Sequence, residues 1–447
     1  MIEQPVSLRE ATRVWTTVAL NSFGGPAGQI SVMHRILVDE RKWISERRFL
    51  HALNYCMLLP GPEAQQLATY VGWLMHGYRG GLVAGGLFIL PGFLSILTLS
   101  LLYTAFADTT WLLGMFVGLK AAVLAVVLQA IVKIGRRVLH NAVMVCLGVA
   151  AFVALYAYAI PFPVVVLAAG VLGLVGAGVR PDLFALIKGH GETGEQPAGE
   201  SLRSGHAPSW RRAVVVAAVC LLLWLAPVVL LIGALGPNHV FAAEAVFFSK
   251  AATVTFGGAY AVLAYVAQQA VDVFGWLRPG EMLDGLGMAE TTPGPLIQVV
   301  QFVGYMGAYR NPGSFDPWVS GVLGSILTTW VTFVPCFLWI FLGAPYVEAV
   351  QANRRLSGGL SAITAAVVGV VANLALWFGL QVLFSTTTLL DVAGGTWTIP
   401  ELSSIQWVST ALFVGAALAL VRFKAPMLPV LLVSAAAGAA ATLLLPA

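Results

Sequence analysis

The residues best suited to chemistry lie at two kinds of helix break, and each kind occurs twice. Proline removes a backbone donor and clashes with the preceding turn, so a Pro-Gly-Pro run inside an apolar segment breaks a helix. A helix that restarts after such a break presents free N–H groups and a positive dipole end, which favour an anion. The candidate anion-binding residues at the breaks are Gly24, Gly25, Pro26, Pro60, Gly61, Pro62, Gly257, Gly258, Thr292, Pro293, Gly294 and Pro295. We expect Pro62 and Pro295 in the first turn of the helices that follow, with Thr292 as an N-cap.

Charged and amide side chains lie beside these breaks. Glu63 and Glu290 are at apolar depth, where a carboxylate is costly and indicates proton coupling or gating. Stabilising a helix start or pairing with a base is the alternative. Lys120 lies deep in an apolar segment, where it could neutralise an anion or pair with Glu63. Gln65 and Gln298 could donate hydrogen bonds to an oxyanion, or hold neighbouring helices together.

Other chemistries find no support in the sequence. The four cysteines are far apart and form no Cys-x-x-Cys or Cys/His cluster, which argues against a disulfide framework and a zinc site. There is no Walker A, His-Glu-x-x-His or kinase-like motif. The first ten residues lack the apolar core of a cleavable signal peptide. We therefore expect a protein that is not an enzyme, with no catalytic residue, metal or cofactor.

The elements that position these residues are membrane helices. Of the 447 residues, 59% are hydrophobic and only 10% charged, whereas soluble proteins carry about 25% charged residues. The composition excludes a water-soluble enzyme and predicts an all-α polytopic membrane protein. The expected apolar segments are 12–33, 51–75, 80–106, 111–133, 140–159, 161–179, 211–235, 247–270, 284–308, 317–343, 357–384, 405–421 and 426–446.

The two halves of the sequence are related. The Phe-Gly-Gly and Pro-Gly-Pro runs recur 233 residues apart, from Gly24 to Gly257 and from Pro60 to Pro293. Such spacing is typical of a duplicated transporter. We predict a first repeat over 1–179, a flexible polar linker over 180–210, an extra connecting helix over 211–246 and a second repeat over 247–447.

Loop charges predict that the repeats are inverted. The loop after the first Phe-Gly-Gly run is basic, and the loop after the second is acidic. If the four broken segments are re-entrant hairpins, about 20 Lys and Arg lie inside. Only Lys250, Arg278 and Arg310 then lie outside. The charge distribution is itself part of the reason for preferring re-entrant hairpins, and thirteen full crossings are the alternative.

At these residues the sequence resembles the chromate ion transporter family in its long, two-domain form. The first half matches through SFGGPAGQISVMHRILVDERKWISERRFLHALNYCMLLPGPEAQQLATYVGW. The second half matches through FSKAATVTFGGAYAVLAYVAQQAV, GWLRPGEMLDGLGMAETTPGPLIQVVQFVGY and TTWVTFVPCFLWIFLGAPY. The first break reads LPGPE and the second ETTPGP, so the two sites need not do equal work.

The resemblance implies a multi-pass transporter of the bacterial inner membrane that exports chromate and confers resistance. Its expected partners are chromate, sulfate as an analogue, and the lipid bilayer, with no nucleic acid; a homo-oligomer stays open. A proton-coupled sulfate or general oxyanion carrier is the alternative in the same class. An intramembrane enzyme acting on lipid would need a nucleophile–base pair or a metal site, and the sequence offers neither.

Overall fold

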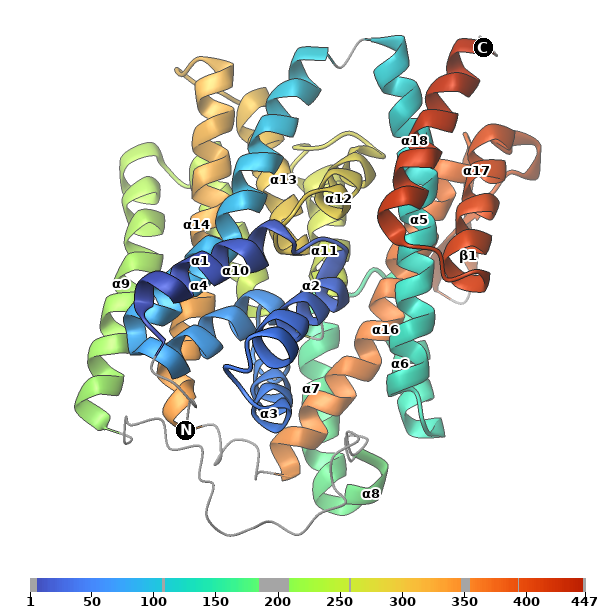
Figure 1. Ribbon diagram of the computed structural model, residues 1–447. Helices are drawn as coiled ribbons and strands as arrows, with labels where there is room; N and C mark the ends of the chain where they lie inside the picture. Colours follow the sequence, from blue (N-terminus) through green and yellow to red (C-terminus); the bar gives the residue numbers. More distant parts are fainter. Residues whose placement is uncertain are drawn as a thin grey trace.

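The chain forms a bundle of membrane helices, as predicted. The computed structural model describes residues 6–106, 109–184, 209–256, 259–346, 354–392 and 394–444. Seven helices in this part of the chain are long and apolar enough to cross a bilayer, and most run from top to bottom in Figure 1. They are α4 (Glu63–Phe106), α5 (Thr110–Val138), α7 (Phe162–Val179), α9 (Trp210–Leu235), α14 (Pro317–Gly343), α16 (Arg354–Leu383) and α18 (Met427–Leu444).

In the first half, helices break at both predicted motifs. The elements are α1 (Leu8–Leu20), α2 (Gly25–His34), the π-helical turn η1 (Arg35–Glu40), α3 (Glu46–Cys56) and α4. Ser7 caps α1 by accepting a hydrogen bond from the backbone N–H of Glu10. α4 bends sharply at His76 and Gly77, where Gly77 has a φ of 62°. It therefore consists of a short and a long helical stretch.

The second half repeats this order of elements. They are α10 (Val240–Thr253), α11 (Ala259–Gln268), the π-helical turn η2 (Gln269–Val273), α12 (Glu281–Thr291), the 3-10 turn η3 (Leu296–Gln298), α13 (Val299–Arg310) and α14. The helices α1–α3 and α10–α13 have 10 to 14 residues, fewer than the roughly 20 that cross a bilayer. These lengths are what re-entrant hairpins require.

The expected helix starts after the Pro-Gly-Pro runs are wrong in detail. Thr292 is the C-cap of α12, because its backbone is extended and its hydroxyl points back to the carbonyl of Ala289. Pro295 precedes η3, and the regular helix α13 begins only at Val299. Pro62 likewise stands immediately before the first residue of α4. Both prolines are N-cap residues: the carbonyl of Pro62 accepts the first hydrogen bond of α4, from Gln66 N–H at 3.0 Å, and that of Pro295 accepts the first of η3, from Gln298 N–H at 2.8 Å.

Two further departures concern regions between the apolar segments. An antiparallel hairpin of β1 (Thr387–Val392) and β2 (Gly395–Pro400) joins α16 to α17 (Trp407–Ala417), where no regular structure was predicted. The short helix α8 (Pro181–Phe184) lies within the predicted linker 180–210. Residues 185–208 of that linker lie outside the described residues.

Helices of the two halves exchange packing partners. α5 packs against α17 and α18, while α16 packs against α6 (Ala142–Tyr156) and α7 (Figure 1). Glycines make both contacts close: a Cβ at Gly118 of α5 would lie 1.8 Å from the Ser434 carbonyl oxygen. A Cβ at Gly369 of α16 would lie 2.0 Å from the Gly148 carbonyl oxygen. Each half thus completes the helical layer of the other.

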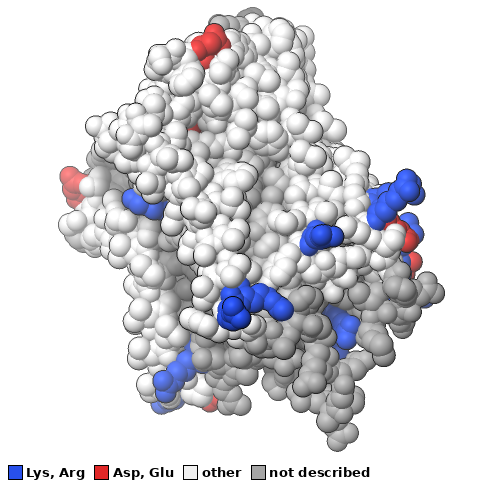
Figure 2. All heavy atoms as spheres, turned by 90° about the vertical axis from the view of Figure 1, so that its left-hand side faces the viewer, with Lys and Arg blue, Asp and Glu red and all other residues white. Residues whose placement is uncertain are grey.

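Basic residues gather toward one end of the molecule. α9 and α16 begin, and α14 ends, at the lower end of Figure 1, where α8 also lies. Arg211 and Arg212 are in the first turn of α9, and Arg355 is in the first turn of α16. On the face shown in Figure 2, the described Lys and Arg side chains lie in the middle and lower parts, and the uppermost charged group is acidic. The arginines at the starts of α9 and α16 therefore lie at the same end of the molecule.

Candidate functional site

The two kinds of break meet across the halves. The backbone N–H of Gly61 donates to the carbonyl of Thr255, at 2.7 Å. The backbone N–H of Gly294 donates to the carbonyl of Ser22, at 3.0 Å. Ser22 and Thr255 each stand just before a Phe-Gly-Gly run, so each Pro-Gly-Pro glycine binds the other half's Phe-Gly-Gly break. The two hydrogen bonds are equivalent by the repeat, and they join four predicted motifs into two crossing points.

Glycine is required at these crossing points for two reasons. Gly61 and Gly294 have φ values of 129° and 114°, which side chains rarely adopt. A Cβ at Gly294 would lie 2.8 Å from the Cα of Gly92 in α4. A Cβ at Gly61 would lie 3.0 Å from the Sγ of Cys336 in α14. Each Pro-Gly-Pro run therefore packs against the long helix of the opposite half.

A carboxyl group lies at the start of α2. Gly24 and Gly25 have φ values of 85° and 67°, and α2 begins at Gly25 with Pro26 in its first turn. The Oε2 atom of Glu290 lies 3.6 Å from the position of a Cβ at Gly25. A carboxylate here is favoured by the positive end of the helix dipole. The break of the first half is thus completed by a side chain of the second.

The carboxyl group of Glu290 is enclosed. The residue is 1% exposed, and the hydroxyl of Tyr260 donates a hydrogen bond to its Oε1 atom. Its Oε2 atom has no hydrogen-bond partner among the described residues. The hydroxyl of Tyr260 also lies 3.9 Å from the position of a Cβ at Gly25. One carboxyl oxygen is therefore held, and the other faces the start of α2.

Glu63 has a different position from Glu290. It is the first residue of α4, after the Pro-Gly-Pro run, and it is half-buried. Glu290 is in the last turn of α12, before the run. By the spacing of the repeat, Met57 is the counterpart of Glu290. The two breaks are therefore not chemically equivalent, as the difference between LPGPE and ETTPGP predicted.

The glutamines near the breaks use their amide donors within the protein. Gln65 donates to Thr69, and Gln66 donates to the carbonyl of Pro60. Gln298 donates to Gln301. In the described part of the chain, the Oε1 atoms of Gln65, Gln66 and Gln298 are buried without a partner. In this conformation the glutamines connect helices and hold the break in shape.

Lys120 pairs with a residue that sequence reasoning missed. Its Nζ atom lies 3.3 Å from the Oδ2 atom of Asp284, and the hydroxyl of Tyr103 donates to the same oxygen at 3.0 Å. The expected pairing with Glu63 is therefore replaced by one with Asp284. The group joins α4 and α5 of the first half to α12 of the second. The Lys120 side chain is 27% exposed, whereas that of Asp284 is 3% exposed.

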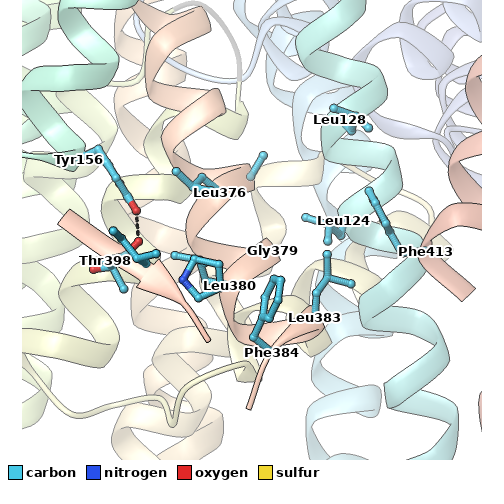
Figure 3. A pocket seen from close by; sticks show the side chains of 13 residues that line it. Leu124, Leu128, Tyr156, Leu376, Gly379, Leu380, Leu383, Phe384, Thr398 and Phe413 are labelled. Carbon is cyan, nitrogen blue, oxygen red and sulfur yellow. Dashed lines mark hydrogen bonds between the residues drawn. The ribbon is translucent and has the colours of Figure 1, made fainter. Parts of the chain in front are cut away.

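The second Phe-Gly-Gly glycines and the main apolar cavity add no described residue to the site. Gly257 and Gly258 lie outside the described residues, and α11 begins after them at Ala259. A cavity of about 370 Å³ lies among α5, α16, α17 and the β-hairpin (Figure 3). It is lined mainly by leucines and other apolar side chains, and the Tyr156 hydroxyl at its edge donates to the carbonyl of Thr398. An oxyanion would find little to bind there, so the breaks remain the better site.

Three residues that bond to the breaks or to the charged groups of the site were not predicted. Tyr260 bonds to Glu290, Gln29 donates to the carbonyl of Gly294, and Asp284 holds Lys120. Tyr260 and Gln29 each follow a Phe-Gly-Gly run within one or two helical turns, which is a signal that could have found them. Asp284 could have been found only as an acidic residue at the start of an apolar segment. Among the described residues, no group of three or more His, Cys, Asp or Glu could hold a metal ion.

The fold and the paired breaks define a multi-pass membrane transport protein of the helical, internally repeated kind. The chromate transporter family model matches residues 9–174 and 243–440. The chain therefore belongs to the chromate transporter family, as the sequence motifs indicated. Such a protein resides in the bacterial cell inner membrane.

Its relatives carry names of transport proteins. The chain is 30% identical to a chromate transport protein of Pseudomonas aeruginosa over 380 residues, which cover 83% of this chain and 80% of that protein. It is 26% identical to a chromate transport protein of Cupriavidus metallidurans, over 82% of this chain and 81% of that protein. An uncharacterized transporter of Methanocaldococcus jannaschii is 23% identical, over 83% of this chain and 84% of that protein. No solved structure matches the chain.

Proposed function

We propose that this protein is a secondary transporter that exports chromate across the cytoplasmic membrane and so confers chromate resistance. Chromate as substrate is suggested by the names of the relatives from Pseudomonas aeruginosa and Cupriavidus metallidurans. The observation that carries the proposal is the reciprocal pair of hydrogen bonds from Gly61 to Thr255 and from Gly294 to Ser22. These bonds hold broken helices of both halves together, where free backbone donors suit an anion.

The anion binds at the start of α2 in this proposal. Its donors there are the backbone N–H groups of the first turn, joined by the Tyr260 hydroxyl when that hydroxyl turns its single proton from Glu290 to the anion. An ionised Glu290 would repel a dianion at this distance, because charges in a low-dielectric site interact strongly. A protonated Glu290 would instead donate its O–H to an oxyanion oxygen. Proton and anion binding are therefore linked at Glu290, which is its coupling role.

Lys120 takes part by exchanging partners. In the described conformation its ammonium is neutralised by Asp284. A dianion that reaches this pair competes with Asp284 for the ammonium. The ammonium attracts the anion, and the closed ion pair blocks the anion's path to the other side of the membrane until the partners exchange. Glu63 marks the equivalent break of the other half, where the inverted relation of the halves would place the opposite entrance.

The membrane potential suffices as the driving force. Moving one charge across 100 mV is worth about 2.3 kcal/mol, so a dianion leaving a negative-inside cell gains about 4.6 kcal/mol alone and about 2.3 kcal/mol when one proton leaves with it. Each 1.4 kcal/mol is a factor of ten, so the supported gradient is about three powers of ten without a proton and about one and a half with one. Export therefore needs no ATP, and the sequence offers no nucleotide-binding motif.

A proton-coupled carrier of sulfate or of oxyanions in general is the second candidate. It is favoured by the buried position of Glu290 at the start of α2. Sulfate and chromate are tetrahedral dianions that present the same acceptors, and a hydrogen-bonding site discriminates strongly only when one substrate lacks a group. We therefore expect weak discrimination between the two anions.

Anion flux into inverted membrane vesicles tests both candidates. With an inside-positive potential, wild-type vesicles are expected to accumulate chromate in proportion to the potential. A Pro293→Ala/Pro295→Ala variant is expected to lose this uptake, because it allows the helix to continue through the break. Pro237→Ala, an exposed proline outside the breaks, serves as the matched control.

The outcomes separate the candidates. Sulfate flux without preference for chromate would establish a general oxyanion carrier. Potential-driven uptake that persists in the double variant would refute binding at the breaks. No anion flux from folded protein would contradict the proposed function and leave the family assignment to stand for the fold.

A further inference from the structure

A second buried carboxyl group lies away from the breaks. Glu244, in α10, is 0% exposed. Neither of its carboxyl oxygens has a hydrogen-bond partner among the described residues. It stands nine residues before Thr253, the end of α10, which places it roughly 14 Å along the helix from the second Phe-Gly-Gly break. It belongs neither to the anion site nor to the Lys120–Asp284 pair.

The neighbouring helices leave room for this carboxyl group. A Cβ at Gly307 of α13 would lie 2.9 Å from Oε1 of Glu244. A Cβ at Gly324 of α14 would lie 3.2 Å from Oε2. The carboxyl group is therefore held between two helices at positions where both lack a side chain. A larger residue at either position would collide with it.

The first half fills the equivalent space differently. At the repeat spacing of 233 residues, Ala11 corresponds to Glu244. After the Pro-Gly-Pro runs the spacing is 232, where Tyr70-Val71-Gly72 matches Phe302-Val303-Gly304, and Met75 corresponds to Gly307. Ala11 is 1% exposed and packs from α1 toward α4, as α10 packs toward α13 and α14. In the first half the alanine Ala11 is matched with the long apolar side chain of Met75. In the second half the carboxyl group of Glu244 is matched with Gly307, which has no side chain. The space in the second half thus accommodates a carboxyl group specifically.

No described charge neutralises Glu244. α14 contains no charged residue, and Arg310 of α13 is held by both oxygens of Glu281, at 2.7 Å each, and by the carbonyl of Trp276. The other titratable groups on α10 and on the helices packed against it are His239, Lys250, Arg211, Arg212, Cys220, Tyr260, Tyr265, Tyr305, Tyr309 and Cys336. Of these, His239 and Lys250 lie on α10 itself, beyond one helical turn on either side of Glu244.

The environment therefore requires a proton on Glu244. An ionised carboxylate without a partner is strongly disfavoured in an apolar interior, and the group avoids this cost by staying neutral. The buried hydroxyls of Ser320 and Ser325 on α14 make no hydrogen bond to Glu244, and they too lack a partner among the described residues. In the described part of the chain, no group of three or more His, Cys, Asp or Glu could hold a metal ion beside Glu244 in place of a proton.

We propose that Glu244 is a proton-binding site, loaded in this conformation and emptied when α10 moves away from α13 and α14. On release the O–H bond breaks, its electron pair stays on the carboxylate, and the proton passes to water that reaches the opened space. Because α10 runs from Glu244 to the second Phe-Gly-Gly break, this movement connects proton release to the anion site. The coupling to transport rests on the proposed function, whereas the protonated state does not.

Infrared spectroscopy of the purified full-length protein tests the protonated state without any substrate. The wild-type spectrum at neutral pH is expected to contain the carbonyl band of a protonated carboxylic acid, which Glu244→Gln removes. Asp272→Asn, at an exposed acidic residue, is the matched control and should keep the band. A spectrum that is unchanged by Glu244→Gln would overturn the proposal.

Proteoliposomes containing a pH-sensitive dye test the coupling. Wild-type protein is expected to move protons together with chromate. Glu244→Gln is expected to keep chromate flux down its gradient and to lower the number of protons moved per chromate, because only Glu290 then binds a proton. If Glu244→Gln does not fold, Glu244→Ala/Gly307→Met replaces it, because this pair copies the packing of Ala11 and Met75.

The outcomes distinguish this inference from the proposed function. An unchanged number of protons moved per chromate in the folded variant would overturn the coupling role of Glu244. Chromate flux without proton movement in the wild type would overturn it as well. Absence of chromate flux in the wild type would contradict the proposed substrate, and the infrared result would still decide whether Glu244 binds a proton.

Discussion

Alanine at Gly294 is expected to destabilise the protein more than alanine at Gly61. At both positions the positive φ costs a side chain about 1–3 kcal/mol. A Cβ at Gly294 would also lie 2.8 Å from the Cα and 3.0 Å from the N atom of Gly92. Both atoms are backbone, so relief requires α4 and the break to move apart, at about 1–3 kcal/mol more. The sum for Gly294→Ala is about 2–6 kcal/mol.

The collision at Gly61 is easier to relieve. A Cβ there would lie 2.6 Å from Nε2 of Gln66 and 3.0 Å from Sγ of Cys336. Both are ends of side chains that can rotate, although Gln66 would give up its hydrogen bond to Pro60, worth about 1 kcal/mol. Gly61→Ala is therefore expected to cost about 2–4 kcal/mol, which is the backbone strain at positive φ plus the lost hydrogen bond.

Thermal unfolding followed by tryptophan fluorescence measures the difference. For a chain of 447 residues, an unfolding entropy of about 2.1 cal/mol/K per residue converts each kcal/mol into about one degree. Midpoints at one scan rate should then fall in the order Gly61→Ala above Gly294→Ala, separated by about one to two degrees. Gly86→Ala is the control, because a Cβ there meets nothing within 4 Å, and its midpoint should equal the wild-type value or exceed it. A Gly294→Ala midpoint at or above that of Gly61→Ala would refute the reasoning.

Three other substitutions probe the charged groups. Lys120→Met should lower the free energy of unfolding by about 3–5 kcal/mol, because it leaves Asp284 buried and without its cation. Adding Asp284→Asn should restore most of the lost stability. Equal unfolding midpoints for the single and double variants would argue against the ion pair. Glu290→Gln should make chromate flux independent of pH between mildly acidic and mildly basic buffers, since the neutral amide fixes the charge; a wild-type pH profile would exclude Glu290 from coupling. Tyr260→Phe should weaken chromate binding and slightly reduce stability, by about 1 kcal/mol for one hydrogen bond, and unchanged binding in a filter assay would remove Tyr260 from the site.

The breaks themselves could be predicted from the sequence because proline and glycine act locally. Pro60, Pro62, Pro293 and Pro295 interrupt helices wherever they stand, and the broken elements were found at those positions. The conformation after each break depends on contacts from elsewhere in the chain. For this reason Thr292, which suits an N-cap by residue type, became a C-cap instead.

The partners of the site residues could not be predicted, because the fold brings together residues that are far apart in sequence. Nothing near Gly61 indicates that its N–H binds Thr255, and nothing near Lys120 indicates Asp284. Glu244 was missed for a different reason. The predicted apolar segment began at residue 247 and left Glu244 in the connecting helix over 211–246, whereas α10 begins at Val240. The β-hairpin was missed because its Thr- and Leu-rich strands lie between two apolar segments and resemble a loop.

The exchange of packing partners between the halves has a consequence for how the protein is made. α5 is synthesised long before α17 and α18, the helices that cover it. Until α18 is made, the surface around Gly118 lacks the contact with Ser434. The packing of the first half is therefore incomplete until about 300 more residues have been synthesised. Two halves made as separate polypeptides would have to find each other before either acquired its final packing.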